Sequence, residues 1–253
     1  MNTAQKIKTR LVIGLTLMAS ATVSLAKDDK PSPKLTEVWQ PIPVKVATNP
    51  IPSDAIPLLQ TAADVDKHWQ HPNGKKVQWI YDNDELTVKP KSGSIISKQK
   101  FCDMQMHLEW RSPKKSERRK NAPRHANSGI KIQRRYEVQI LDTYNTPIYV
   151  NGQAASIYKQ SVPLVDALSP SGEWNTYDII FKAPKFDDAG TLTKAATITV
   201  LHNGVLVQDH YQITGTTMYR GKAEYFNAHG CEPILLQDHN GEISFRNIWV
   251  RKL

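Results

Sequence analysis

Apolar and polar residues alternate along several short segments of this chain. Segments 103–110 and 136–142 show the pattern most clearly. In the first, apolar residues alternate with Asp103, Gln105, His107 and Glu109, and in the second Tyr136, Val138 and Ile140 alternate with Glu137 and Gln139. A period of two is typical of a β-strand with one buried face. Further strands are predicted by similar patterns at 78–88 (broken by a turn at 82–84), 176–182, 196–202, 205–207, 234–236 and 243–250.

Two Asn-Gly pairs separate predicted strands. Asn203-Gly204 lies between 198–202 and 205–207, and Asn240-Gly241 lies between 234–236 and 243–250. Both pairs predict hairpins, because each turn residue must accept a positive φ. No segment has a sustained helical period, and only a short helical turn is predicted near 61–69. The fold class is therefore all-β, an antiparallel sandwich with its apolar faces turned inward.

The first residues have the form of a secretory signal peptide. Lys6, Lys8 and Arg10 precede a short apolar run, and Ser24 and Ala26 stand at the positions of a small-residue cleavage site. The run is too short for a membrane span, which needs about 20 apolar residues. We expect cleavage after Ala26 and export to the periplasm or the medium, with no membrane span in the product.

Prolines recur through 27–60, which predicts an extended lead-in without regular helix or central strand. The rest, 61–253, is predicted to form one β-sandwich domain, which is a common size for that architecture. Cys102 and Cys231 are the only cysteines. In an oxidising compartment they form one disulfide or remain two partly buried thiols, and their spacing does not decide between the two.

The net charge of +9 is unevenly distributed. The predicted signal peptide carries three basic residues and no acid, and segment 112–125 carries six basic residues against Glu117 alone. The remaining chain is close to neutral. The basic segment has no aromatic residue, whereas a surface that binds nucleic acid usually mixes the two. It is therefore predicted to be a solvated loop, and no nucleic-acid partner is expected.

Hydrogen-bonding side chains recur at positions where the strands alternate. If neighbouring strands place them on one face, they form a cleft suited to a polyhydroxylated ligand, whose hydroxyls need both donors and acceptors. The alternative is an ordinary solvated sheet face. Asp238 and His239 also fit simple turn chemistry, and Arg246 also fits a structural ion pair with Glu109 or Glu137. The candidates are Glu109, Asn127, Glu137, Gln139, Asp142, Gln153, Tyr158, Gln237, Asp238, His239 and Arg246.

The chain has no Gly-rich phosphate loop, G-x-S-x-G elbow, H-E-x-x-H motif or paired Cys motif. Seven stretches of the chain carry a resemblance to a known family. They are Asn127-Ser128-Gly129-Ile130, Tyr136-Glu137-Val138-Gln139-Ile140-Leu141-Asp142, Asn151-Gly152-Gln153-Ala154, Gly172-Glu173-Trp174-Asn175-Thr176-Tyr177-Asp178, His202-Asn203-Gly204-Val205, Leu236-Gln237-Asp238-His239 and Phe245-Arg246-Asn247-Ile248-Trp249. With these stretches in this order, the chain resembles the 3-keto-disaccharide hydrolase domain family from about Glu37 to the C-terminus. The basic segment and the two cysteines depart from the family pattern.

The resemblance implies a jelly-roll sandwich of the concanavalin A-like lectin/glucanase type, with a carbohydrate cleft on its concave sheet. It also implies substrates whose C3 hydroxyl a partner glycoside 3-oxidoreductase has oxidised to a ketone. The ketone acidifies the C2 proton, so a base can remove it and the group at C1 can leave by elimination. Addition of water would make the net reaction a hydrolysis. One base, one oxyanion stabiliser and one acid suffice, unlike the carboxylate pair of a retaining glycosidase.

Roles follow as hypotheses from that chemistry. Glu137 or His239 is the candidate base, and Arg246 or a bound divalent cation is the candidate oxyanion stabiliser. Glu109, Gln139 and Asp238 are candidates for binding hydroxyls or a metal ion. The identity of a metal, and the need for one, stays open at this point.

Three other functions fit the same fold class. A lectin-like module would bind carbohydrate without turnover, but the aromatic residues Trp110, Tyr136 and Tyr177 fall on apolar faces, where they form no platform. A laminarinase-type hydrolase needs an E-x-D-x-x-E run, and Gln139 places an amide where that run has a carboxylate. A structural envelope protein is supported only by the proline-rich lead-in.

Overall fold

The structure is a computed structural model that describes residues 38, 40–48, 50–123 and 125–253. The chain divides into two units, 1–44 and 45–253. The predicted signal peptide, 1–26, and the first part of the lead-in lie outside the described residues. The described residues of the first unit, 38 and 40–44, contain no helix or strand. No helix in the described ranges is long and apolar enough to cross a membrane.

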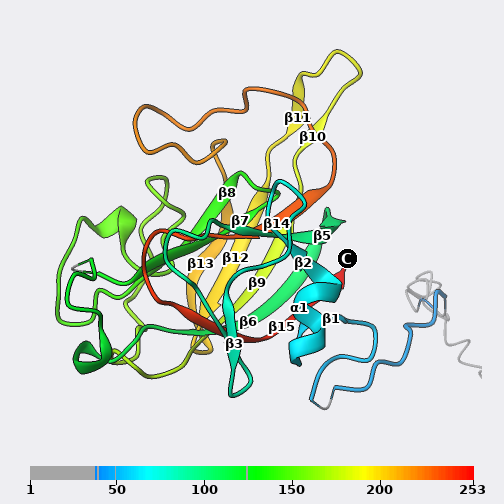
Figure 1. Cartoon of the computed structure of the whole chain (residues 1–253). Helices are drawn as coiled ribbons and strands as arrows, with labels where there is room; N and C mark the ends of the chain where they lie inside the picture. The colour runs from blue at the N-terminus through cyan, green and yellow to red at the C-terminus, as the bar shows by residue number, and fades with distance from the viewer. Residues whose placement is uncertain (1–37, 39, 49, 124) are drawn as a thin grey trace, which may run out of the picture. The chain divides into compact units, whose positions relative to one another are not determined.

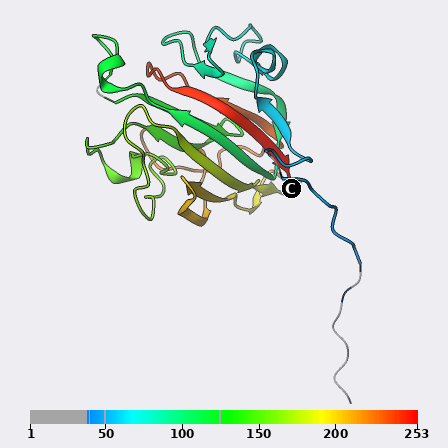
Figure 2. The same cartoon turned by 90° about the horizontal axis from the view of Figure 1, so that it is seen from below.

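Two antiparallel sheets pack face to face in the second unit (Figures 1 and 2). The larger has eight strands in the order β13-β12-β9-β6-β15-β4-β3, with β1 also paired to β15, and the smaller has the order β2-β5-β14-β7-β8. The antiparallel sandwich predicted from the sequence is confirmed. The larger sheet contains β1 (Ile56–Leu59), β3 (Ile80–Asp82), β4 (Glu85–Thr87), β6 (Met104–Arg111), β9 (Asn175–Lys182), β12 (Thr197–His202), β13 (Val205–Gln212) and β15 (Ser244–Lys252). The smaller contains β2 (Trp69–Gln70), β5 (Ile95–Phe101), β7 (Asn127–Ile132), β8 (Tyr136–Leu141) and β14 (Glu232–Leu236).

A few short elements lie outside the two sheets. Helix α1 (Ala62–His68) falls where the sequence predicts a helical turn, and Trp69 after it is buried and donates from Nε1 to the carbonyl oxygen of Leu58 at 2.9 Å. The other elements are the β10–β11 hairpin (Lys185–Phe186 and Leu192–Lys194) and the single turns η1 (Lys115–Glu117) and η2 (Val150–Gly152).

The core fills the space between the two sheets. Its largest fully buried side chains include Trp110 and Tyr177 from the larger sheet and Tyr136 from the smaller. Trp110 meets Tyr177 edge to face at 5.6 Å between ring centroids, a favoured geometry for aromatic pairs. The apolar stripes of segments 103–110 and 136–142 both belong to this core, so their apolar faces turn inward as predicted.

The two Asn-Gly pairs have different outcomes. Asn203 and Gly204 both have positive φ and join β12 to β13, so that hairpin is confirmed. The hairpin predicted at Asn240-Gly241 is wrong, because β14 lies in the smaller sheet and β15 in the larger. Gly241 instead permits a close approach, since a Cβ there would lie 2.3 Å from the backbone nitrogen of Asn127.

Strand β1 lies within 27–60, the range that the sequence assigns to the lead-in. It pairs antiparallel with β15, with Pro57 opposite Trp249. In Figure 2 the red strand β15 lies beside β1. Proline is tolerated there because β1 has only this one partner strand in the sheet, so a missing amide donor costs little.

Contacts in the structure decide the state of the two cysteines and show how the basic segment is held. Cys102 and Cys231 form a disulfide. In the basic segment Lys114, Lys115 and Lys120 are exposed, as a solvated loop requires. Arg118 departs from that expectation, because its guanidinium pairs with the buried carboxylate of Asp142.

Candidate functional site

Strands β7 and β8 build the floor of the site. They pair residue by residue, with Lys131 opposite Glu137 and Gly129 opposite Gln139. Val138, between the two polar residues of β8, points into the core, so Glu137 and Gln139 point to the outer face of the smaller sheet. Both are nevertheless buried, with 5% and 3% of their surface exposed. Other segments must therefore cover this face.

One covering segment adds to the free edge of β8. The backbone nitrogens of Ala155 and Tyr158 donate to the carbonyl oxygens of Gln139 and Glu137, each at 3.0 Å. This pairing satisfies the exposed backbone groups of an edge strand. It also places the Tyr158 side chain beside the two polar residues of β8.

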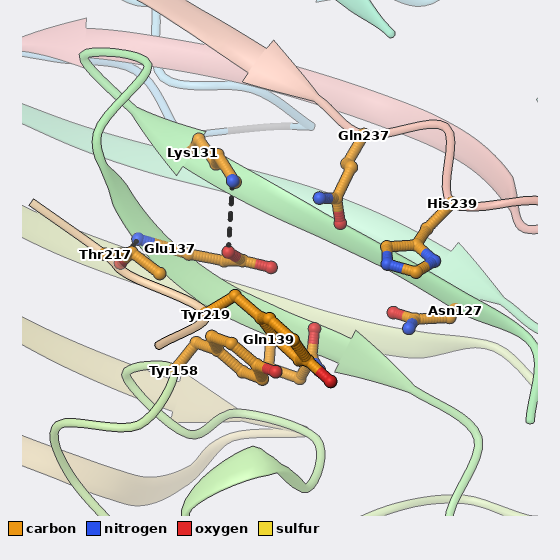
Figure 3. Close-up of a pocket in the computed structure, with 9 residues that line it drawn as sticks. All are labelled: Asn127, Lys131, Glu137, Gln139, Tyr158, Thr217, Tyr219, Gln237 and His239. Carbon is orange, nitrogen blue, oxygen red and sulfur yellow. Dashed lines mark hydrogen bonds and ion pairs between the residues drawn. The ribbon is translucent and has the colours of Figure 1, made fainter. Parts of the chain in front are cut away.

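Nine side chains enclose a cavity of about 140 Å³ above this floor. Figure 3 shows them around a common space, four from β7 and β8, two from the segment that follows β14, and three from loops. The lining residues are Asn127, Lys131, Glu137, Gln139, Tyr158, Thr217, Tyr219, Gln237 and His239. The structure thus brings together six of the residues proposed from the sequence.

An ion pair between Lys131 and the buried carboxylate of Glu137 lines the cavity. The Nζ atom of Lys131 is 3.4 Å from Oε2 of Glu137, as the dashed line in Figure 3 marks. Burial raises the pKa of the Glu137 carboxyl above its ordinary value, and the positive charges of Lys131 and His239 offset part of that rise. Such a carboxylate is a stronger base than an exposed one.

Three amide oxygens in the same cavity are buried and lack a hydrogen-bond partner among the described residues. They are Oδ1 of Asn127, Oε1 of Gln139 and Oε1 of Gln237. Buried acceptors without donors are rare in native proteins and usually indicate a ligand or ordered water. A ligand with several hydroxyl donors would satisfy all three acceptors.

His239 and Gln237 are held in place by the turn after β14. The backbone nitrogen of Gln237 donates to the carbonyl oxygen of Gly129 at 3.0 Å. Asp238 accepts from the backbone nitrogens of Gly93 and Asn240, each at 2.9 Å. Asp238 therefore supports the turn, the simpler of the two interpretations that the sequence allowed, and is absent from the cavity lining.

Lys131, Thr217 and Tyr219 are site residues that the sequence analysis missed. Lys131 could have been found, because a three-residue turn between two six-residue strands places it opposite Glu137. Thr217 and Tyr219 come from a long loop without a local pattern. Oγ1 of Thr217 accepts from the backbone nitrogen of Glu137 at 3.0 Å, which fixes the loop on β8.

Arg246 and Glu109 do not reach this cavity. A bulge in β15 turns Arg246 and Asn247 to the outer side of the larger sheet, since Phe245 and Ile248 on either side of them are in the core. Nε of Arg246 donates to Glu109 at 2.6 Å, and Asn247 donates to the same carboxylate at 2.9 Å. We therefore leave Arg246 and Glu109 out of the site, because the core of the sandwich separates them from Glu137.

Asp142 and Gln153 also lie outside the lining. Asp142 follows β8 and is 4% exposed. Its carboxylate accepts from Ser112 and Ser171 at 2.9 and 2.6 Å, besides its ion pair with Arg118. The Asp142 carboxylate therefore holds the basic segment through Ser112 and Arg118. Gln153 follows η2, and its carbonyl oxygen accepts from the backbone nitrogen of Ser156 at 3.1 Å.

The described residues contain no group of three or more His, Cys, Asp or Glu side chains that could hold a metal ion. In the cavity, Glu137 and His239 are the only side chains of these types, and the Lys131 ammonium lies against the carboxylate. Lys131 places a localised positive charge in the cavity, whereas Arg246, the residue that the sequence analysis named for such a charge, lies elsewhere.

The fold and the comparisons together define a carbohydrate-active β-sandwich. The family of 3-keto-alpha-glucoside-1,2-lyase-like domains matches residues 56–251, and the chain belongs to this family. The match begins with β1 and ends within β15.

Solved structures agree with this family. A crystal structure of a "putative glycosyl hydrolase" from Parabacteroides distasonis is 43% identical, with a TM-score of 0.79, and covers 86% of this chain and 95% of that chain. A second one from the same organism is 18% identical, with a TM-score of 0.54, and covers 79% of this chain and 99% of that one. The second likeness shows the fold alone. A comparison with curated proteins gave no significant match.

Proposed function

We propose that this protein cleaves the glycosidic bond of 3-keto-glycosides, with Glu137 as the base. The observation that carries the proposal is the content of one cavity. A buried carboxylate lies against an ammonium group, and three unpartnered amide oxygens surround the pair. The amides suit the remaining hydroxyls of a sugar ring, and the charged pair suits removal of a proton beside a ketone.

Glu137 takes the proton from C2. The bonding electrons of C2–H move into the bond between C2 and C3, and the ketone oxygen becomes an enolate. Burial favours this step because it raises the pKa of the carboxyl and so its basicity. Lys131, 3.4 Å from the carboxylate, supplies positive charge beside the position where the enolate forms.

Elimination follows from the enolate. The C1–O bond breaks, its electron pair leaves with the aglycone oxygen, and His239 donates a proton to that oxygen. The sugar product carries a double bond between C1 and C2 beside the C3 ketone. Addition of water across this double bond gives the free 3-keto-sugar and makes the net reaction a hydrolysis. His239 is placed as the acid because Glu137 is the group that pairs with Lys131, whose charge serves the enolate.

The substrate of this reaction must be made by another enzyme. A C3 ketone on an intact glycoside arises by oxidation of a secondary alcohol, so a glycoside 3-oxidoreductase has to act before this protein. The family name, which refers to a 3-keto-alpha-glucoside lyase, supports the same order of events.

The test is turnover of a purified 3-keto-glucoside, with and without a chelator, followed by identification of the products by NMR. Glu137→Gln and His239→Gln are each expected to lower kcat/KM by about 10² to 10⁴-fold, the usual effect of losing a general base or acid. Arg246→Gln is the discriminating control, because the sequence alone suggested it for this site and the fold places it on the other sheet. Full activity in both cavity variants would overturn the proposal, and binding without turnover by the wild type would favour a lectin-like module.

Export is part of the proposal. The disulfide between Cys102 and Cys231 supports an oxidising compartment, in keeping with the signal peptide expected at 1–26. N-terminal sequencing of the protein from a periplasmic or culture fraction should begin at Lys27. An intact Met1 in a protein confined to the cytoplasm would contradict it.

A further inference from the structure

A second chamber adjoins the cavity that holds Glu137. Its volume is about 350 Å³, within the usual size of a small-molecule site. Four side chains line both spaces: Asn127, Gln139, Tyr158 and His239. The two chambers are therefore parts of one cleft that meet at these residues.

The linings of the two chambers differ in chemistry. The chamber around Glu137 has no aliphatic side chain in its lining. The second chamber has three, Pro123, Leu141 and Ile148, and also the ring of Tyr149. Leu141 ends β8 on the same face as Gln139, is 2% exposed and is not part of the core between the sheets. A leucine in that place provides an apolar surface for whatever enters the chamber.

Tyr158, which lines both chambers, is hydrogen-bonded to Tyr149, which lines the second. The hydroxyls of Tyr149 and Tyr158 lie 2.8 Å apart, and the Nζ atom of Lys159 lies 5.6 and 5.7 Å from the centres of their rings. Burial, and next the hydrogen bond with Tyr149, raises the pKa of the Tyr158 phenol. Tyr158 therefore stays protonated and neutral at the junction, beside His239.

A glycoside whose oxidised sugar occupies the first chamber must extend its C1 substituent through the junction. His239 lines both spaces, so it can reach the oxygen that joins the two parts. We propose that the second chamber binds the aglycone and selects glycosides whose aglycone is an apolar ring rather than a second hexose. This inference rests on the proposed function and names the substrate class of the same site.

The test compares three substrates with the same oxidised glucosyl group. Methyl and cyclohexyl 3-keto-glucosides release alcohols of similar leaving ability, so a difference between them reports binding of the apolar ring. A 3-keto-disaccharide tests the polar alternative. We expect kcat/KM for the cyclohexyl compound to exceed that of the other two by about tenfold or more, the usual scale of discrimination in an apolar pocket.

Ile148→Ser should bring the cyclohexyl-to-methyl ratio of the full-length protein toward one. Val165→Ser is the matched control, because Val165 is 49% exposed and lines neither chamber. It should leave the ratio unchanged.

Each outcome has a distinct meaning. A wild-type ratio near one, an unchanged ratio in Ile148→Ser, or a preference for the disaccharide would overturn the aglycone proposal while leaving the proposed function in place. Turnover of none of the three compounds would overturn the proposed function, and this inference with it.

Discussion

Lys131 and Glu137 face each other across the β7–β8 hairpin, with Nζ of the lysine 3.4 Å from Oε2 of the glutamate. The pair has two functions in the proposed mechanism. The lysine favours the ionised form of a buried carboxylate, and its charge stabilises the enolate. An amide in place of the lysine would change both, and the two effects can be measured separately.

The first prediction concerns the pH profile. Activity requires ionised Glu137, so kcat/KM should rise with pH through the pKa of that carboxyl, which burial places above the ordinary value of 4.5. Lys131→Gln removes the positive charge that lowers this pKa, so the acid limb should move to higher pH. The plateau should also fall by about 10² to 10³-fold, as on loss of an oxyanion stabiliser.

Lys100→Gln is the matched control for this measurement. Lys100 also pairs with a glutamate, Glu232, at 3.5 Å, but its side chain is 61% exposed and lies outside the cavity. The pH profile of kcat/KM in Lys100→Gln should match that of the wild type. An acid limb in Lys131→Gln that stays in place or moves to lower pH would refute the coupling.

The second prediction concerns the space beneath the carboxylate. A Cβ at Gly129 would lie 2.7 Å from Oε1 of Glu137, so Gly129→Ala should push the carboxylate away from its position. We expect kcat/KM to fall by about 10²-fold, the scale of a displacement of about 1 Å at a catalytic group. Stability should change little, because the atom that must move ends a flexible side chain.

Gly230→Ala provides the comparison, since a Cβ there meets no atom within 4 Å. Thermal melting and steady-state kinetics on both variants separate a local shift from unfolding. Equal activity of the two alanine variants would show that Glu137 does not need its present position.

Part of the fold and of the site can be predicted from the sequence alone. Alternation in 103–110 and 136–142 gives the strands and their buried faces, because the pleat of a strand fixes which side chains share a side. The family resemblance then identifies Glu137, Gln139 and His239. Alternation does not say which sheet a strand joins. Glu109 and Glu137 both point away from the core, yet they lie on opposite outer faces of the sandwich.

The remaining differences arise from contacts between distant segments. Asn240-Gly241 has the composition of a hairpin turn. The strand that follows it, β15, nevertheless pairs with β6 and β4 and so lies in the larger sheet, away from β14. Four of the nine lining residues lie on β7 and β8, and the other five lie outside the strands. Among those five the sequence already offered Tyr158, Gln237 and His239 as candidates, whereas Thr217 and Tyr219 reach the cavity from a long loop without a local pattern.

The third prediction concerns the loop that carries Thr217 and Tyr219. The disulfide of Cys231 with Cys102 ties the end of this loop to β5, across a sequence separation of 129. Cys102→Ser/Cys231→Ser should lower the free energy of unfolding by up to about 4 kcal/mol, on the scale expected for a long closed loop. Denaturant titrations of the double variant, and of the wild type with and without reductant, measure this loss. Identical midpoints in all three would show that the cross-link does not contribute to stability.

The fourth prediction concerns acid stability and His202. This histidine is 1% exposed, and its Nε2 lies 2.9 Å from Oδ1 of Asn175. Burial lowers the pKa of the imidazole from 6.5 to about 4. Between pH 6.5 and 4 the unfolded chain therefore binds a proton at His202 that the folded protein does not bind. The contribution of His202 to stability is complete above pH 6.5 and is lost as the pH falls toward 4. At pH 5 the loss amounts to about 2 kcal/mol.

His202→Phe removes the titrating group and keeps a ring against Trp110 and Tyr177, which His202 contacts at 6.1 and 4.8 Å between ring centroids. Oδ1 of Asn175 still accepts from the backbone nitrogen of Ser169 at 2.9 Å. The difference in unfolding free energy between pH 7 and pH 5 should shrink by about 2 kcal/mol in this variant. The full difference between pH 7 and pH 5 should persist in His210→Asn, where the replaced imidazole is exposed. A pH dependence equal in all three proteins would mean that His202 titrates in the folded state as it does in the unfolded chain.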